Sequence, residues 1–420
     1  MAMIERLEKG VVIKGGRPVP TEHAPEDKIA ARGKTIAYKI MRAHDISQNP
    51  AKMRLKFDAL VSHDITYVGI IQTARASGMK EFPIPYALTN CHNSLCAVGG
   101  TINEDDHFFG LSAAKKYGGI FVPPNLAVIH QYAREALCGC GKMILGSDSH
   151  TRYGCYGTMG IGEGGGELAK QLLGNTYDID APEVVLVWLE GAVPHGIGPH
   201  DVALALIGET FPDGFVKNKV LEFAGPGLSG LSMDFRIGVD VMTTETSCLS
   251  SIWVTDDKVE EYYEDVGRPA EFKRLEIEEG AYYDAMVTVR LDEMESMIAL
   301  PFHPSKVYTI HELQKDPARI FAEIEAACNE ELGGRVKMDL RRNINEKGQV
   351  VVEQGVIVGC AGGMYENIAE AADILRGKSV GNGYFSLSVY PASAPIALAM
   401  AKDGLAADLM EAGALVKSAF

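Results

Sequence analysis

The stretch Lys142-Met-Ile-Leu-Gly-Ser-Asp-Ser-His-Thr151 sets a carboxylate, hydroxyls and an imidazole at the point where a short apolar segment ends. Seven glycines follow between residues 154 and 166, and residues 167–173 then have a helical pattern. Polar side chains at a strand end, followed by backbone that allows close approach, commonly form the active site of an α/β protein. The alternative is an ordinary polar turn whose hydrogen bonds are satisfied locally.

The order of strand, turn and helix recurs in the rest of the chain and predicts an α/β fold. Residues 1–24 have no helical period and are expected to form an arm that packs on the body. Strands are predicted at residues 119–122, 143–145, 184–189, 218–223, 283–291, 350–353, 356–358, 385–390 and 414–420. Helices are predicted at residues 25–44, 57–79, 106–117, 167–173, 199–208, 258–265, 318–331, 366–375, 395–402 and 405–412.

Two breaks in composition divide the chain. Prolines and glycines cluster at residues 194–199, and Pro301-Phe-His-Pro-Ser305 has the character of a linker. Such segments are typical of domain boundaries. We therefore expect domains at residues 1–192, 193–304 and 305–420.

Composition narrows the classes of function. The chain has 420 residues and a formal net charge of −16, which argues against nucleic acid as a main partner. It shows no apolar stretch near the ~20 residues of a membrane span and no apolar signal-peptide core, so we expect a cytoplasmic protein. The eight cysteines are scattered and include no Cys-x-x-Cys pair, which argues against a disulfide framework or a structural zinc site.

Several ionisable residues lie near predicted strand ends. They are His92, which follows the apolar run that begins at Tyr86, together with Asp148 and His150, and more weakly His63–Asp64, His130 and Asp240. Asp–His pairs serve general acid/base catalysis, because the carboxylate fixes the imidazole tautomer, and they also serve metal sites. Ser149 lacks the Gly-x-Ser-x-Gly context of a hydrolase nucleophile. Gly160-Ile-Gly-Glu-Gly-Gly165 matches a dinucleotide fingerprint but does not directly follow a strand, so we discount that site.

Four segments, in this order along the chain, resemble the aconitase family of iron–sulfur hydro-lyases. They are Ile129-His-Gln131, Gly146-Ser-Asp-Ser-His-Thr151, Phe223-Ala-Gly-Pro-Gly227 and Val358-Gly-Cys-Ala-Gly-Gly-Met-Tyr-Glu366. The resemblance implies three-layer α/β/α domains around a [4Fe–4S] cluster, with a mobile swivel domain attached or supplied separately. It implies dehydration and rehydration of a hydroxy-carboxylic acid such as citrate, isocitrate or a related acid.

The resemblance also implies roles for single residues. Cys360 would be a cluster ligand. His92, His130, Asp148 and His150 would handle protons and the substrate hydroxyl, and Asp240 would stand where the family has a glutamate near the open iron. The predicted substrate contacts are His63, Ser149 and Arg236, of which His63 and Arg236 replace a glutamine and an asparagine of the family.

This chain departs from the family pattern in ways that bear on function. Asn90-Cys-His92 stands where Cys-Asp-His is typical, and Ala361-Gly-Gly363 replaces Thr-Asn-Ser, which points to a divergent hydratase rather than an enzyme for citrate. The family's Cys-x-x-Cys pair and swivel domain would follow Phe420. We therefore expect the 420 residues to be a fragment, in preference to one subunit of a split enzyme, because large subunits of the family normally keep all three cysteines. As given, the chain is expected to be inactive and to hold no intact cluster, since one thiolate cannot replace three.

Two other classes of function remain open. A mononuclear metal-dependent hydrolase could use His130, Asp148 and His150 as metal ligands, which bound zinc would support. A non-enzymatic module could bind an anion or nucleic acid in the same cleft, although the acidic charge disfavours nucleic acid. The expected partner is a small anionic carboxylic acid, with no membrane.

Overall fold

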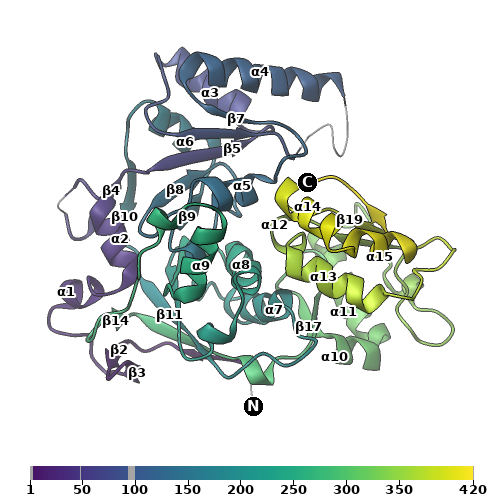
Figure 1. The fold of residues 1–420 in the computed structure, drawn as a ribbon. Coiled ribbons are helices and arrows are strands. Elements are labelled where there is room, and N and C mark those ends of the chain that lie inside the picture. The colour runs from purple at the N-terminus through teal and green to yellow at the C-terminus, as the bar shows by residue number, and fades with distance from the viewer. Residues whose placement is uncertain (1–2, 48, 93–99, 420) are drawn as a thin grey trace.

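The computed structural model describes residues 3–47, 49–92 and 100–419. Three groups of strands and helices follow one another along the chain and pack together (Figure 1). Residues 93–95, which complete the polar cluster after His92, lie outside these ranges, as do Cys96 and Phe420. Within the ranges, no helix combines the length and apolar character needed to cross a membrane.

The first group is built on a five-stranded parallel sheet with the order β7-β6-β5-β8-β9. Its central strands are buried at every position, as expected for a parallel sheet covered on both faces. The strands are β5 (Ala59–His63), β6 (Tyr86–Thr89), β7 (Ile120–Val122), β8 (Met143–Gly146) and β9 (Met159–Gly162). The helices are α3 (Tyr67–Ala76), α4 (Thr101–Tyr117), α5 (Ile129–Ala136) and α6 (Gly165–Leu172).

The second group is a five-stranded sheet with the order β1-β15-β11-β12-β13, parallel except for β1. The strands are β1 (Ile4–Leu7), β11 (Val184–Glu190), β12 (Val220–Ala224), β13 (Ser250–Trp253) and β15 (Ala285–Arg290). The helices are α7 (Pro199–Thr210), α8 (Met233–Met242) and α9 (Asp257–Asp265). Strand β11 already lies at the centre of this second sheet, although it ends at Glu190. The chain therefore enters the second sheet before the domain boundary predicted after residue 192.

The third group has a three-stranded parallel sheet with the order β18-β19-β20. The strands are β18 (Gln354–Ile357), β19 (Ser386–Val389) and β20 (Leu415–Val416). The helices are α10 (Ile310–Lys315), α11 (Pro317–Glu331), α12 (Gly359–Gly362), α13 (Tyr365–Leu375), α14 (Ala394–Lys402) and α15 (Leu405–Glu411). Ser393 caps α14 by accepting the Ile396 N–H, as the sequence predicts.

Small elements complete the described chain. A three-stranded sheet consists of β14 (Tyr282–Tyr283), β2 (Val11–Lys14) and β3 (Arg17–Pro20), and two antiparallel pairs are β4 (Lys52–Leu55) with β10 (Tyr177–Asp180) and β16 (Met297–Ala299) with β17 (Val307–Thr309). Residues 1–24, predicted as an arm without helical period, contain the three strands β1, β2 and β3. The helix predicted for residues 25–44 is two, α1 (Lys28–Arg32) and α2 (Ile36–His44), because the first ends at Gly33.

Two other predictions of secondary structure were wrong. Residues 57–79, predicted as one helix, form strand β5 and then helix α3. Residues 59–63 are buried on both sides, and a short apolar run of that kind does not reveal its period. Of the two strands predicted at residues 350–353 and 356–358, only the second is present, as β18 at 354–357, and residues 351–353 belong to no strand.

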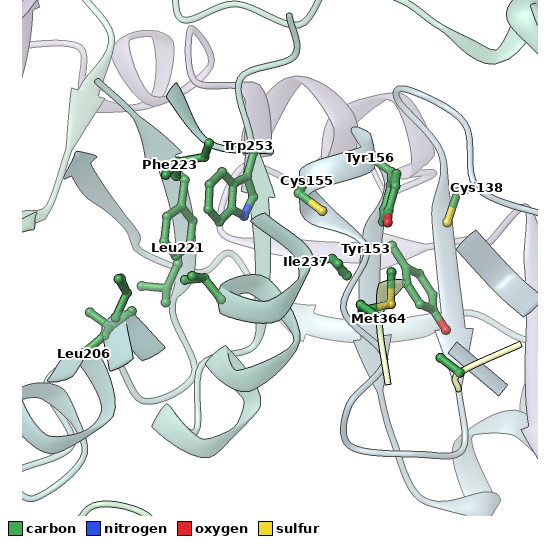
Figure 2. Packing of buried hydrophobic residues seen from close by; sticks show 14 of the residues in the cluster. Cys138, Tyr153, Cys155, Tyr156, Leu206, Leu221, Phe223, Ile237, Trp253 and Met364 are labelled. Carbon is green, nitrogen blue, oxygen red and sulfur yellow. The ribbon is translucent and has the colours of Figure 1, made fainter. Parts of the chain in front are cut away.

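The largest hydrophobic cluster includes residues from all three groups. Phe223 and Trp253 stack with ring centroids 4.2 Å apart. Met364 of the third group lies beside Ile237 and Tyr153 in the same core (Figure 2). Because this apolar core is shared, the groups pack as one body, and side chains from all of them can meet at one site.

Candidate active site

Four histidines surround one carboxylate, that of Asp148. The His130 Nε2 atom lies 2.8 Å from Asp148 Oδ1, and the Nδ1 atom of His150 lies 3.6 Å from the same oxygen. The Nε2 atoms of His92 and His63 lie 3.3 and 3.5 Å from the other oxygen, Oδ2. The structure thus brings together five of the residues that the sequence singled out.

Three adjacent parallel strands explain the convergence. His63 is the last residue of β5, His92 follows β6 by three residues, and Asp148 follows β8 by two. The chain runs from β5 outward to β7 and then returns to β8 on the other side of β5. Ligand sites of open α/β sheets lie at such a switch point, beyond the carboxyl ends of the strands. His130 reaches the same place from the first turn of α5.

The glycines after Asp148 serve the fold of the loop. A Cβ atom on Gly162 would lie 2.3 Å from the Asp148 carbonyl oxygen, and one on Gly160 would lie 2.7 Å from the Thr151 carbonyl oxygen. Strand β9 can therefore pass directly behind the loop only without side chains at these positions. The sequence predicted that backbone in the glycine run could approach a ligand closely. In the structure, the close approach of Gly160 and Gly162 is to the loop that carries Asp148.

The histidines differ in charge. Burial lowers the pKa of His92, but hydrogen bonds to Asp148 and Cys91 outweigh it and raise that pKa to about 10. His150 likewise reaches a pKa of about 10, because hydrogen bonds to Asp148 and Glu245 outweigh burial. Burial lowers the pKa of His130 to about 4. Burial would raise the pKa of Asp148, yet the surrounding imidazoles hold it well below its usual range. At neutral pH, His92 and His150 are cations and His130 is neutral.

Neutral His130 has a defined tautomer. Its Nε2 faces a carboxylate, which can only accept, so Nε2 carries the proton and donates it to Asp148. Its Nδ1 then accepts from the Tyr153 hydroxyl at 3.0 Å. His92 is held on both sides as well, since its Nδ1 lies 3.2 Å from the Cys91 sulfur. The residue before His92, Cys91, thus contacts the imidazole through its thiol.

These protonation states predict how stability depends on pH. A histidine whose folded pKa is raised stabilises the fold fully below its unfolded pKa of about 6.5, and that contribution is lost as the pH rises through about 10. We expect His92 and His150 together to contribute about 2 kcal/mol at pH 6, because both are one-third exposed and partly screened.

Urea unfolding of the wild type and of a His92→Gln/His150→Gln variant, from pH 6 to pH 10, measures this contribution. The difference in free energy of unfolding should shrink steadily toward pH 10. A difference that stays constant over this range would contradict the assignment of charge.

Glu245 is a member of the site that the sequence analysis missed. Its Oε1 lies 3.0 Å from His150 Nε2, on the opposite side of the ring from Asp148. Asp240, predicted to stand where the family has a glutamate near the open iron, is fully buried and accepts from the Trp253 indole at 2.7 Å. Asp240 lies in the last turn of α8, whereas Glu245 lies on the short turn Thr243–Thr246 that follows, and the end of the helix turns Glu245 toward the histidine.

The two acids have distinguishable effects. We expect Glu245→Gln to lower the pKa of His150, because the charge that supports its imidazolium is lost, while leaving the fold stable. Asp240→Asn should lower the free energy of unfolding by about 1–3 kcal/mol, because a buried hydrogen-bond network is disturbed. Titration of the His150 ring by NMR and thermal unfolding of both variants would check this. A shift of His150 in the Asp240 variant alone would reverse the assignment.

Of the other two predicted substrate contacts, Arg236 lies apart from the histidines, whereas the Ser149 hydroxyl lies 3.5 Å from His150 Nδ1. Arg236 is fully buried and forms a two-fold ion pair with Asp256 at 2.6 and 2.8 Å, so its guanidinium is occupied in the core. Ser149 is exposed next to the cluster, and its carbonyl accepts from the Thr244 hydroxyl at 2.6 Å.

His63, Asp64 and His92 place possible metal-binding atoms within 4.8 Å of one another. However, the two rings stack with centroids 3.9 Å apart and planes at 21°. An ion ~2.1 Å from a nitrogen of each would lie far outside both ring planes, whereas an imidazole lone pair lies in its plane. The Asp64 oxygens also already accept from the His92 N–H and contact His107 Nε2. This group is a hydrogen-bonded support for His92.

A cavity of about 170 Å³ opens beside Asp148. Its wall includes His92, His130 and His150, the apolar residues Val128, Ile129 and Val358, and the turn that carries Cys360. Gly359 precedes the cysteine with a φ of +84°, a backbone conformation that glycine adopts without strain. The turn of the third group therefore faces the strand ends of the first.

A model of the aconitase family (aconitate hydratase) matches residues 38–420. The protein belongs to the aconitase family. Among its relatives, the 3-isopropylmalate dehydratase large subunit of Elusimicrobium minutum is 28% identical, over 73% of this chain and 65% of the relative. The mitochondrial aconitate hydratase of Saccharomyces cerevisiae is 26% identical over 91% and 49%, respectively. The large subunit 2 of 3-isopropylmalate dehydratase from Archaeoglobus fulgidus is 27% identical over 91% and 84%.

The chain thus spans about half to two thirds of the length of the first two relatives. Its α/β architecture is consistent with an aconitase-type fold. The aconitase family is known for [4Fe–4S] clusters, and among the seven described cysteines of this member Cys360 is the one that is partly exposed.

Proposed function

We propose that this protein acts, as part of its full-length form, as a hydro-lyase that dehydrates and rehydrates a small hydroxy-carboxylic acid. One observation carries the proposal. A single carboxylate holds two imidazolium groups and one neutral imidazole at a cavity that also contains Cys360. Such an arrangement supplies proton donors and positive charge where an anionic substrate would bind.

The residues around Cys360 fit an anionic iron–sulfur group. Arg134 is a fully buried cation that donates to the Cys360 carbonyl at 2.7 Å, and its Nε and Nη2 atoms have no partner among the described residues. An anion at this turn would balance the charge. We infer that Cys360 is one ligand of a [4Fe–4S] cluster in the full-length protein. When bound, the cluster supplies a Lewis acid for the departing hydroxyl group.

Dehydration breaks one C–O and one C–H bond, forms a C=C bond and releases water, so it needs an acid for the departing hydroxyl and a base for the proton on carbon. We propose that the described residues supply the acid and that the rest of the full-length protein supplies the base. The departing hydroxyl needs a proton, and the protonated rings of His92 and His150 line the cavity to donate it. Asp148 stays ionised and keeps each ring in place after the proton has left. In the reverse reaction, the histidine ring that gave up the proton takes a proton back from water.

The substrate is proposed to be a small anion. The two imidazolium groups and the exposed Ser149 can hold a carboxylate, while Val128, Ile129 and Val358 offer an apolar wall. The relatives are named for aconitate and for 3-isopropylmalate, and we propose a hydroxy acid of this general class. All seven described cysteines are free thiols, which supports our proposal that the protein works in a reducing compartment such as the cytoplasm.

Anaerobic reconstitution of the full-length protein with iron and sulfide tests the proposal. We expect a stable cluster with about four irons and four sulfides. Hydration of unsaturated di- and tricarboxylic acids should then be visible as loss of ultraviolet absorbance. Bound zinc without sulfide, together with hydrolysis that depends on His130, Asp148 and His150, would favour the metal-dependent hydrolase instead.

A further inference from the structure

Arg134 is a buried cation that forms no ion pair with the described residues. Its side chain is fully buried on α5, and among the described residues it forms no ion pair with a carboxylate. Its Nη1 atom donates to the Cys360 carbonyl at 2.7 Å and to Gln131 Oε1 at 3.1 Å, and it lies 3.8 Å from the Met364 sulfur. The Nε and Nη2 atoms have no hydrogen-bond partner within residues 3–47, 49–92 and 100–419.

Such a group is costly unless something neutralises it. An arginine stays protonated in proteins, and a buried charge without a partner lowers stability. Neighbouring groups are Cys155, Tyr153 and Tyr156, and burial raises the pKa of all three well above its ordinary value. They remain neutral at physiological pH and cannot balance the guanidinium.

Two acids in this region, Asp234 and Glu135, form hydrogen bonds with other groups. Asp234 is close enough for Arg134 to influence its pKa, but it accepts the Glu366 N–H instead of pairing with the guanidinium. Glu135 accepts from Gln131 Nε2 at 2.8 Å and from the Ser393 hydroxyl at 2.9 Å. Among the described residues, no acid therefore forms an ion pair with Arg134, and the guanidinium is directed through Nη1 at the Cys360 turn.

Helix α5 places this cation with little freedom. Arg134 lies four residues after His130, so the same face of the helix presents the imidazole to Asp148 and the guanidinium to the Cys360 turn. The start of α5 is tied to the third group, because the Val128 N–H donates to the Ala392 carbonyl. Met364, which the guanidinium touches, lies in the shared core beside Tyr153 (Figure 2).

We propose that Arg134 is a positioning residue that anchors the Cys360 turn and supplies the counter-charge for the anionic iron–sulfur group that Cys360 holds. This proposal rests on the proposed function. The role of Arg134 goes beyond the proposed function, because Arg134 touches neither the substrate nor an acid/base group. Arg134 raises the reduction potential of the cluster, because a nearby positive charge favours the added electron.

The test compares three variants of the reconstituted full-length protein. Arg134→Gln removes the charge, and Arg134→Lys keeps it but loses the planar donor pair. Arg152→Gln is the matched control, because Arg152 is also buried and has no carboxylate ion pair among the described residues, while donating to the Thr151 and Cys248 carbonyls. The readouts are iron and sulfide content, the rate of iron loss to a chelator, the reduction potential and thermal unfolding.

We expect Arg134→Gln to lose iron about tenfold faster than the wild type and to shift the reduction potential to more negative values. Arg134→Lys should keep the wild-type potential but also lose iron faster. Arg152→Gln should reduce thermal stability while leaving the potential and iron retention unchanged.

The outcomes separate the two proposals. A wild type that takes up no cluster would overturn the proposed function. A wild type that takes up a cluster, with Arg134→Gln equal to it in potential and retention, would overturn the role of Arg134 alone. If Arg134→Gln does not fold, wild-type iron retention in Arg134→Lys would overturn the anchoring role.

Discussion

Replacing Asp148 with asparagine is expected to lower the activity of the full-length protein by about 10²–10⁴-fold. The carboxylate contacts four imidazoles and is the partner that keeps His92 and His150 protonated. Without its charge both pKa values fall, so the proton donors are largely neutral at pH 7. Stability should fall by about 3–5 kcal/mol, because a buried charge network is broken. Steady-state kinetics and urea unfolding would measure the two effects.

Asp58→Asn is the matched control for this variant. Asp58 also pairs with a histidine, with its Oδ2 atom 2.9 Å from His44 Nε2, and it accepts the Met143 N–H at the opposite end of β8. Its loss should reduce stability modestly and leave activity unchanged. An Asp148→Asn variant with wild-type activity would refute the central role of the carboxylate.

The loop after β8 was predictable because its signal is local. Met143, Ile144 and Leu145 form an apolar run that stops at a glycine, and the polar residues follow directly. Strand β5 was not predictable in the same way. Residues 59–63 are buried on both faces, so they lack the alternation that marks a half-buried strand. Without β5, the sequence could not show that His63 ends a strand next to Asp148.

The identity of the acid beside His150 depends on a tertiary feature. Asp240 and Glu245 are five residues apart, and the resemblance to the family pointed to the first. The structure buries Asp240 under Trp253 and leaves Glu245 on the short turn after α8. Arg236 shows the same limit, since its partner Asp256 lies 20 residues away and its burial follows from packing of α8. Residue type and order along the chain do not show which side chains are already hydrogen-bonded or ion-paired within the core.

The second large effect is expected at Cys360. Cys360→Ala in the full-length protein should reduce bound iron and sulfide at least tenfold and abolish hydratase activity, since a metal ligand is removed outright. The cysteine lies on the wall of the cavity with His92, His130 and His150, so its loss should act on the site without opening the core. Iron and sulfide analysis after anaerobic reconstitution, together with an activity assay, would measure the loss.

Cys328→Ala separates this effect from a general loss of thiols. Cys328 is buried in α11, in the small cluster that includes Ile320 and Ile324, and its thiol faces the Pro301 carbonyl at 3.5 Å. Its replacement should cost about 1–2 kcal/mol of stability and leave the iron content unchanged. Equal iron loss in both variants would show that Cys360 is not a specific ligand of the cluster. Because Arg134 holds the Cys360 carbonyl, the Cys360→Ala protein also keeps that anchor, so its defect would report the thiol itself.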